Sequence, residues 1–137
     1  MPEPTEPTAA ARRFENAYFA DGLAQHRLVV KRCTACEHAQ FPALPRCPAC
    51  GSWELRDDEI RTSGDVYSWI RINREELVTD DAADLLPLVV VTVDLDDGVR
   101  LFGRYAPGGT PAIGERVAGT FVERRGATDL VFERAAR

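Results

Sequence analysis

The sequence has no apolar run long enough to cross a membrane. Its longest candidate, Leu85–Val93, is short and is interrupted by Pro87, whereas a transmembrane helix needs about 20 predominantly apolar residues. The first residues also lack the basic and then hydrophobic pattern of a secretory signal. We therefore expect a cytoplasmic protein with no membrane partner.

An excess of basic residues is also absent. The 17 Lys and Arg residues are outnumbered by 22 Asp and Glu residues, so the net charge is -5. Bulk electrostatics would not draw such a chain to duplex DNA or to an anionic membrane. The hydrophobic fraction of 45% is ordinary for a globular protein. A length of 137 residues suits one average domain or two very small ones.

Recognisable catalytic motifs are missing as well. The sequence has no phosphate-binding P-loop and no G-x-G-x-x-G fingerprint. Its two histidines, His26 and His38, have no evident acidic partner in the sequence. Neither Ser63 nor Ser68 lies in the G-x-S-x-G context of a nucleophile elbow. Together these absences favour a non-catalytic protein.

What the sequence does contain is a cluster of cysteines. All four of them form two C-x-x-C motifs within one short stretch: Cys33, Cys36, Cys47 and Cys50. Two such turns joined by a hairpin can surround one ion with four thiolates, which is the arrangement of a structural zinc site. Since protein ligands fill all four positions, no open site remains for a catalytic water. The spacing therefore predicts a zinc ribbon.

Three alternatives to this zinc ligation remain open. Two disulfides are possible in three connectivities, although a reducing cytoplasm disfavours them. Four thiolates would also bind iron with similar geometry. His38, beside the first motif, could replace one thiolate. Gly51 follows the second motif, where a left-handed backbone is easy for glycine, but Glu37 occupies the equivalent place, so we expect strain or a different turn there.

The residues after the cysteines read as strands. Alternating or continuous apolar patterns separated by turn residues mark five short segments, and the turn at Asp96–Gly98 separates the second from the third. This number of short strands predicts a small closed or nearly closed barrel. The segments are residues 65–72, 86–95, 99–106, 115–123 and 129–134.

Other elements are expected before the barrel and on its surface. The segment "HRLVVKRC" reads as a strand in which Leu28 and Val30 alternate against Val29. In the first barrel strand, alternation places Tyr67 and Trp69 on one face, with Arg71 in register. Aromatics and arginine on a barrel surface can stack single-stranded bases, but Trp69 could equally be half-buried by packing.

The order of these segments resembles a known family. An aromatic helix, the cysteine stretch, "GDVYSWIRI", "LPLVVVTVDLDDGVRLFGRY" and "IGERVAGTFVE" are together similar to the zinc-ribbon plus OB-fold accessory proteins once catalogued only as a domain of unknown function. The resemblance covers residues 12–134. It departs at Glu37, where the family often has glycine.

The resemblance implies a mainly β fold with an N-terminal helix, a rubredoxin-like zinc ribbon and a five-stranded OB-fold barrel. We accordingly expect a disordered tail over residues 1–10 and a helix over residues 11–26. The zinc ribbon would follow over residues 27–58, and the OB-fold over residues 59–137.

The resemblance also implies a function. Such proteins are partners of thiolase-superfamily enzymes, including thiolases, polyketide-type acyltransferases and lipid-transfer-protein-like aldolases that cleave steroid side-chain CoA thioesters. The partner chain would hold the catalytic residues, and this chain would stabilise it and help bind acyl-CoA in a two-plus-two assembly. Arginines suit CoA phosphates, and the candidates are Arg46, Arg71, Arg74 and Arg104. Aromatic side chains anchor interfaces, and the docking candidates are Phe14, Tyr18, Phe19, Tyr67 and Trp69.

The main rival function is that of an OB-fold protein that binds single-stranded nucleic acid, although the acidic balance weighs against it. An autonomous enzyme is the second rival, which the absence of an evident nucleophile disfavours.

Overall fold

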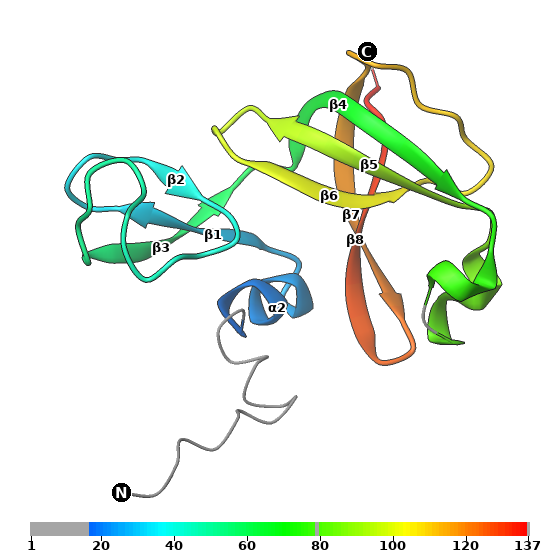
Figure 1. Cartoon of the computed structure of the whole chain (residues 1–137), viewed down its shortest axis with the longest axis horizontal. Coiled ribbons are helices and arrows are strands. Elements are labelled where there is room, and N and C mark those ends of the chain that lie inside the picture. Colours follow the sequence, from blue (N-terminus) through cyan, green and yellow to red (C-terminus); the bar gives the residue numbers. More distant parts are fainter. Residues whose placement is uncertain (1–16, 79, 137) are drawn as a thin grey trace, which may run out of the picture. The chain divides into compact units, whose positions relative to one another are not determined.

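The computed structural model describes residues 17–78 and 80–136. The chain divides into two compact units, Met1–Ile60 and Arg61–Arg137, which appear in blue to green and in green to red in Figure 1. The predicted tail, the first part of the predicted helix and the docking candidate Phe14 lie outside the described residues.

The first unit begins with the helix α2, Ala17–Ala24. Its end is a Schellman motif, in which the Arg27 amide donates to the Gly22 carbonyl (2.8 Å) and the His26 amide donates to the Leu23 carbonyl (2.9 Å). His26 adopts the left-handed conformation this motif needs, with φ of 58°. Position 22, inside the helix, is occupied by glycine because a Cβ there would lie only 2.8 Å from the Val29 side chain. The helix therefore packs closely on the strand that follows.

That strand is the centre of a small antiparallel sheet of order β2-β1-β3. Its members are β1 (Leu28–Cys33), β2 (Ala39–Gln40) and β3 (Leu55–Ile60). The expected alternation is wrong at Val29, which is buried along with Leu28 and Val30. The reason is that α2 covers the face of β1 that would otherwise meet solvent, so β1 is apolar on both faces.

The strand β3 is polar, and its charges match those of β1. Lys31 lies directly opposite Asp57 and forms an ion pair with it. The Arg32 Nε donates to the Asp58 carboxylate, its diagonal neighbour, at 2.7 Å, and Arg27, the residue before β1, pairs with Glu59 at 3.2 Å. Because cross-strand pairs of opposite charge favour strand pairing, this complementarity supports the register that brings β3 beside the cysteines.

The second unit is a closed five-stranded barrel, as the sequence predicts. Its strand order is β4-β5-β6-β8-β7, and pairing of β4 with β7 closes it. All neighbours are antiparallel except β6 and β8, which run parallel. This is the connectivity of an OB-fold. The strands are β4 (Ser63–Ile72), β5 (Leu88–Leu95), β6 (Arg100–Tyr105), β7 (Arg116–Arg124) and β8 (Ala127–Arg134).

The barrel interior is filled by alternate residues of its strands. In β5 every second residue is buried, from Val89 through Leu95, while the residues between them are half-buried. The largest completely buried side chain is Phe132 of β8. Gly103 of β6 makes room for it, since a Cβ at that position would lie 2.6 Å from the Phe132 ring. The strands thus enclose one packed core.

A β-bulge interrupts the first barrel strand. Val66 lies opposite Val93, but Ser68 lies opposite Thr92, so Tyr67 is the additional residue. Trp69 consequently faces Val91, which is fully buried, while Tyr67 is 53% exposed. The expectation that Tyr67 and Trp69 share one face is therefore wrong, because the bulge reverses the alternation between them.

Two short 3-10 helices, η1 (Glu75–Leu77) and η2 (Asp80–Leu85), connect β4 to β5. The connection from β6 to β7 is held against the bulge, since the Val66 amide donates to the Glu115 carbonyl and the Gly114 amide donates to the Val66 carbonyl. No helix among the described residues has both the length and the apolar character needed to cross a membrane.

Candidate metal centre

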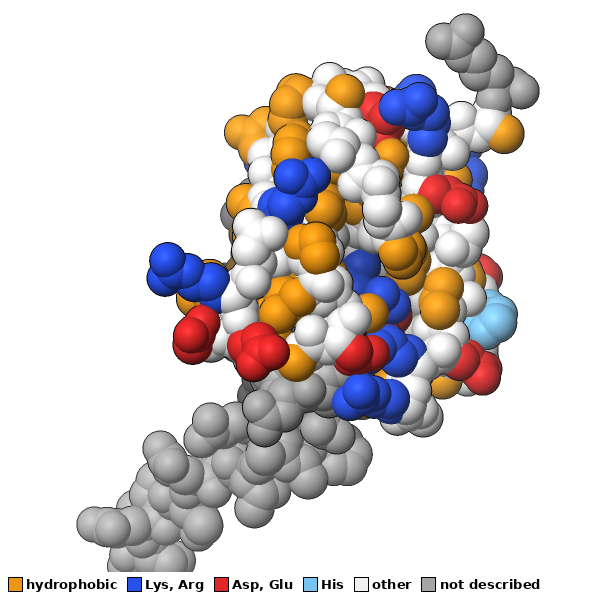
Figure 2. All heavy atoms as spheres, turned by 90° about the vertical axis from the view of Figure 1, so that its right-hand side faces the viewer, with side chains coloured by type: hydrophobic (Ala, Val, Ile, Leu, Met, Phe, Trp, Pro, Cys, Tyr) orange, Lys and Arg blue, Asp and Glu red, His pale blue; other side chains and the backbone are white. Residues whose placement is uncertain are grey.

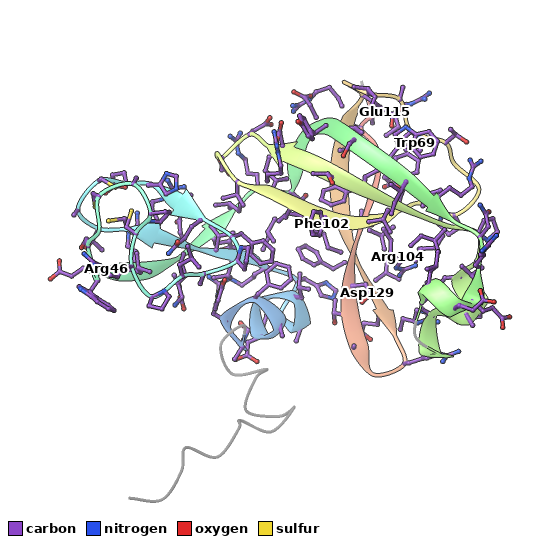
Figure 3. The ribbon with its side chains drawn as sticks, viewed as in Figure 1. Arg46, Trp69, Phe102, Arg104, Glu115 and Asp129 are labelled. Atoms are coloured by element: carbon purple, nitrogen blue, oxygen red, sulfur yellow. The ribbon has the colours of Figure 1, made fainter. Side chains whose placement is uncertain are left out.

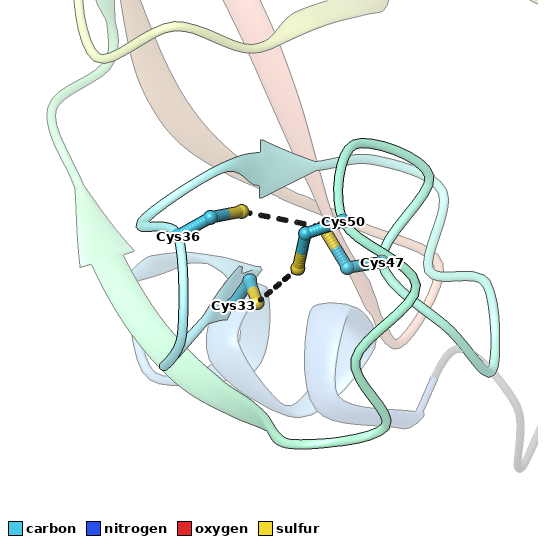
Figure 4. A group of neighbouring side chains, drawn as sticks. All are labelled: Cys33, Cys36, Cys47 and Cys50. Carbon is cyan, nitrogen blue, oxygen red and sulfur yellow. Dashed lines mark hydrogen bonds between the residues drawn. The ribbon is translucent and has the colours of Figure 1, made fainter.

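The four cysteines come together at one end of the first unit. Their sulfur atoms all lie within 4.8 Å of one another, and Figure 4 shows two of the pairs, Cys33–Cys50 and Cys36–Cys47, each 3.6 Å apart. A tetrahedral site with metal–sulfur bonds of about 2.3 Å requires sulfurs about 3.8 Å apart. A disulfide would require about 2.05 Å. The spacing therefore fits a four-thiolate metal site, and all four cysteines are free.

The two C-x-x-C turns are built alike. In the first, the Glu37 amide donates to the Cys33 carbonyl at 3.0 Å, and the Cys33 amide donates to the His38 carbonyl at 2.9 Å. In the second, the Gly51 amide donates to the Cys47 carbonyl at 2.8 Å. His38 thus contributes its backbone to the turn, and its ring is not a member of the metal-binding group.

Glu37 has the left-handed backbone that the second turn gives to glycine. Its φ is 67°, against 80° for Gly51. For a residue with a Cβ this conformation costs roughly 1–2 kcal/mol. The strain expected at Glu37 is therefore present, while the turn keeps the geometry of its glycine counterpart. Arg32 helps to hold it, because its guanidinium donates to the Glu37 carbonyl at 2.7 Å.

Backbone amides donate to the sulfurs, but they lower the pKa of only some of the four thiols. The Cys36 amide donates to the Cys33 sulfur and is the main cause that lowers the pKa of Cys33 to about 7. The pKa of Cys36 is raised to about 12, because the hydrogen bond from the His38 amide, which lowers it, is outweighed by burial and the other three sulfurs. Four thiolates this close need a cation between them. The donor set fits Zn²⁺, which we take as the structural cofactor of this site.

Arg46, a candidate for binding CoA, supports the second turn of the zinc ribbon. Its Nε donates to the Gly51 carbonyl at 2.9 Å, and its guanidinium lies 5.2 Å from the ring centre of the exposed Trp53. Figure 3 shows Arg46 on the cysteine loops. It belongs to the first unit, whereas the other three arginine candidates belong to the barrel.

The barrel arginines do not form one cluster. Arg71, at the end of β4, donates to the Thr110 hydroxyl at 3.1 Å and lies 5.7 Å from the Trp69 ring centre. Arg74 follows β4 and is exposed. Arg104 of β6 is mostly buried, with 16% of its side chain exposed, and pairs with Asp129 of β8 at 3.1 Å, as Figure 3 shows.

Arg104 also lines a pocket of about 360 Å³ on the barrel. The walls are largely apolar and come from residues 84–89, at the end of η2 and the start of β5, and from residues 104–108, at the end of β6 and after it. The Nε of Arg104 is buried with no hydrogen-bond partner. Since Asp129 balances the charge of Arg104, the side chain is better suited to a neutral hydrogen-bond acceptor than to a phosphate.

Tyr18 and Phe19, the two docking candidates on the described part of the helix, pack within their own unit. The Tyr18 hydroxyl accepts a hydrogen bond from the Ala43 amide at 3.2 Å, and Lys31 lies 4.8 Å from the centre of its ring. Burial raises the pKa of Tyr18. Phe19 packs against Phe41 with ring centres 4.7 Å apart. Both side chains pack α2 against the loop between the two cysteine motifs.

Sequence reasoning missed Phe102, the most exposed of the large hydrophobic side chains. A signal was available, because in β6 the residues Arg100, Phe102 and Arg104 alternate with apolar or small residues. A period of two assigns Phe102 to the face of the arginines, which is the outer face of the barrel.

Comparisons with known proteins match both units. The family described as "ChsH2, rubredoxin-like zinc ribbon domain" matches residues 20–56. A chain of the solved structure "Ltp2-ChsH2(DUF35) aldolase" is 30% identical, with a TM-score of 0.77 over 99% of this chain and 100% of that chain.

Two curated relatives are matched over only part of their length. A Thermomonospora curvata protein named "probable enoyl-CoA hydratase alpha subunit" is 36% identical over 73% of this chain and 30% of its own length. A Methanothermobacter thermautotrophicus protein named "DUF35 domain-containing scaffold protein" is 30% identical over 56% of each chain. This chain therefore matches only about a third to a half of these relatives.

Proposed function

This chain belongs to the DUF35 family of zinc-ribbon and OB-fold proteins, and we propose that it is a non-catalytic subunit of an enzyme complex that acts on acyl-CoA thioesters. The observation that carries the proposal is the match over 99% of this chain and 100% of the other to a chain of the solved "Ltp2-ChsH2(DUF35) aldolase". The names of the two curated relatives, a hydratase subunit and a scaffold protein, support the same role.

The chemistry of the described residues also supports a non-catalytic role. The four cysteines are the one group of three or more potential metal ligands among residues 17–78 and 80–136. Four protein ligands close that site to water or substrate. A stable scaffold with a saturated metal site suits a subunit that supports and positions another chain.

The partner we propose is a thiolase-superfamily enzyme, of the thiolase, acyltransferase or retro-aldolase type, in a two-plus-two assembly. The partner would supply the nucleophile and the acid–base groups. This chain would contribute to holding the CoA moiety, with Arg71 and Arg74 as the candidates for its phosphates, since both are exposed at one end of the barrel.

The experiment is co-expression with a thiolase-superfamily chain of the same organism, followed by light scattering on the eluted complex. We expect a stable complex with the mass of two copies of each chain. Titration calorimetry with CoA then compares the wild-type complex with Arg71→Gln and Arg74→Gln, which should weaken binding, and with Arg61→Gln as the matched control. Failure of the two chains to associate would overturn the proposal.

A further inference from the structure

Large hydrophobic side chains are exposed on the outer face of β4, β5 and β6. Tyr67 is 53% exposed, Ile70 58% and Phe102 72%. The strand register places them together, since Ile70 lies opposite Val90 and Phe102 lies opposite Thr92. Val90 and Thr92 are two residues apart in β5, so their side chains and those of their partners lie on the same face of the sheet. We call this the barrel patch, and it consists of Tyr67, Ile70, Val90, Thr92 and Phe102.

The bulge in β4 brings Tyr67 into the barrel patch. As the additional residue it turns outward, and its ring lies 3.6 Å from the guanidinium carbon of Arg100 on β6. Because β5 lies between these two strands, the ring extends across the outer face of β5. The connection from β6 to β7 fixes this arrangement by pairing with both backbone groups of Val66. The position of Tyr67 in the barrel patch is thus fixed by backbone hydrogen bonds of the barrel.

The cations that border the barrel patch already have partners. Arg100 donates to the Asp94 carboxylate at 2.6 and 3.1 Å, and Arg104 pairs with Asp129 at 3.1 Å. Each arginine charge is therefore balanced locally, and the patch offers no free cation for a phosphate backbone. On the face in Figure 2, too, basic side chains are scattered among hydrophobic and acidic ones. This balance favours an uncharged, apolar occupant.

Barrel closure restricts the form of that occupant. The central strand β5, which carries Val90 and Thr92, is paired on both sides, with β4 and with β6. Its backbone groups are therefore not available to an added strand at the middle of the patch. An occupant that covers the whole patch contacts it through side chains, which suits a folded apolar surface better than an extended peptide.

We propose that the barrel patch docks a folded, apolar surface of the partner enzyme subunit. This rests on the proposed function, and it assigns the interface to the outer face of β4, β5 and β6 rather than to the aromatics of α2. Phe102 is the central anchor because it is large, rigid and the most exposed member of the patch. Aromatic anchors of this kind dominate binding energy at interfaces.

The test measures affinity for the purified thiolase-superfamily chain, with Phe102→Thr and Ile70→Thr as patch variants. Threonine keeps the β-branched character that strands favour. Val122→Thr on β7 and Ile113→Thr are the matched controls, since both residues are exposed outside the patch. We expect Phe102→Thr to weaken Kd by about 10- to 100-fold and the controls to change it by less than about threefold. Unchanged zinc content and melting temperature would establish that each variant is folded.

Other outcomes separate the alternatives. If the wild-type chain binds and Phe102→Thr binds equally well, the assigned interface is wrong while the proposed function stands. If the wild-type chain does not bind at all, both are wrong. A homodimer that Phe102→Thr dissociates would assign the patch to a second copy of this chain. Salt-sensitive binding of an oligothymidine that Phe102→Thr abolishes would assign it to nucleic acid. Either result overturns the proposal.

Discussion

The ribbon unit and the barrel unit differ in what fills their interiors. In the barrel, Phe132, Leu101 and Val117 are almost completely buried, together with the alternate valines of β5. In the ribbon, the largest fully buried side chains are Leu28 and Val30, and the cysteine end depends on two buried sulfurs. A unit this small cannot bury enough apolar surface to be stable alone. Zinc ligation therefore takes the place that hydrophobic packing holds in the barrel.

This difference predicts that each unit can be disrupted without the other. The chain offers a reporter for each, because its two tryptophans are divided between them: Trp53 lies in the ribbon and Trp69 in the barrel. The variant Trp69→Phe leaves the ribbon reporter, and Trp53→Phe leaves the barrel reporter. The predictions below use this division.

The largest effect is expected from removal of one zinc ligand. Cys47→Ser leaves three thiolates, and structural zinc contributes on the order of 10 kcal/mol to the folding of small zinc domains. We expect loss of zinc, unfolding of residues 28–60 and a barrel that stays folded. Elemental analysis and the two tryptophan signals measure this. A barrel that unfolds together with the ribbon would contradict the independence of the units.

The second prediction reverses the first. Phe132→Ala removes the largest fully buried side chain of the barrel, and truncations of this kind cost about 3–5 kcal/mol. We expect the melting temperature reported by Trp69 to fall while the zinc content is unchanged. Val122→Ala, at an exposed position of the same barrel, serves as the control. Zinc loss at the temperature of barrel melting would indicate coupled units.

Acid should separate the units in a third way. The hydrogen bond from Arg116 is the main cause that lowers the pKa of Asp96 to about 2, from its usual 3.8. The folded pKa lies below the unfolded one, so this carboxylate stabilises the barrel above about pH 4, and the contribution is lost as the pH falls toward 2. Zinc thiolates compete with protons at higher pH. We expect zinc release first, measured with a chromogenic chelator, and then barrel unfolding.

The variant Arg116→Gln tests the cause of the second acid transition. It removes the donor to Asp96, so the barrel should lose part of its dependence on pH between about 4 and 2. The ribbon transition should not move, because Arg116 belongs to the other unit. An acid profile of the barrel identical to that of the wild type would exclude Asp96 as its source.

The smallest effect is expected at Glu37. Its left-handed backbone, with φ of 67°, should be relieved by Glu37→Gly, which stabilises the ribbon by about 1 kcal/mol after the entropy of glycine is subtracted. The ion pair with Arg56 that would be lost is 3.5 Å long and exposed, so it is worth little. Arg125→Gly, at a φ of 51° in the barrel hairpin, is the matched control and should leave zinc affinity unchanged.

The barrel was predictable because its signal is local. Apolar alternation in β4, a continuous β-branched run in β5 and the turn residues after it indicate strands before any partner is known. The bulge at Tyr67 was not predictable in this way. It depends on two hydrogen bonds with residues far along the chain, in which the Gly114 amide donates to the Val66 carbonyl and the Val66 amide donates to the Glu115 carbonyl. Contacts between residues this far apart in the sequence do not change the pattern of apolar and polar residues in β4.

The metal site was also predictable, since spacing alone specifies four thiolates. The strand β3 was missed because "LRDDEI" has no apolar alternation, and its register comes from charges on β1. Val29 was misassigned because a covering helix is a tertiary feature. Sequence reasoning thus succeeded for elements with their own residue pattern. It failed where the pairing or burial of a residue depends on another element that packs against it.

The parallel pairing of β6 with β8 has a consequence for synthesis on the ribosome. The strand pairs of the ribbon all lie within residues 28–60, so the nascent chain can bind zinc and fold this unit early. The barrel can only close after β8 emerges, because β8 joins β6 to β7. Until then the valine-rich β5 belongs to an open sheet with unpaired edge strands, a form prone to aggregation. For the growing chain, the period before β8 emerges is therefore the vulnerable one.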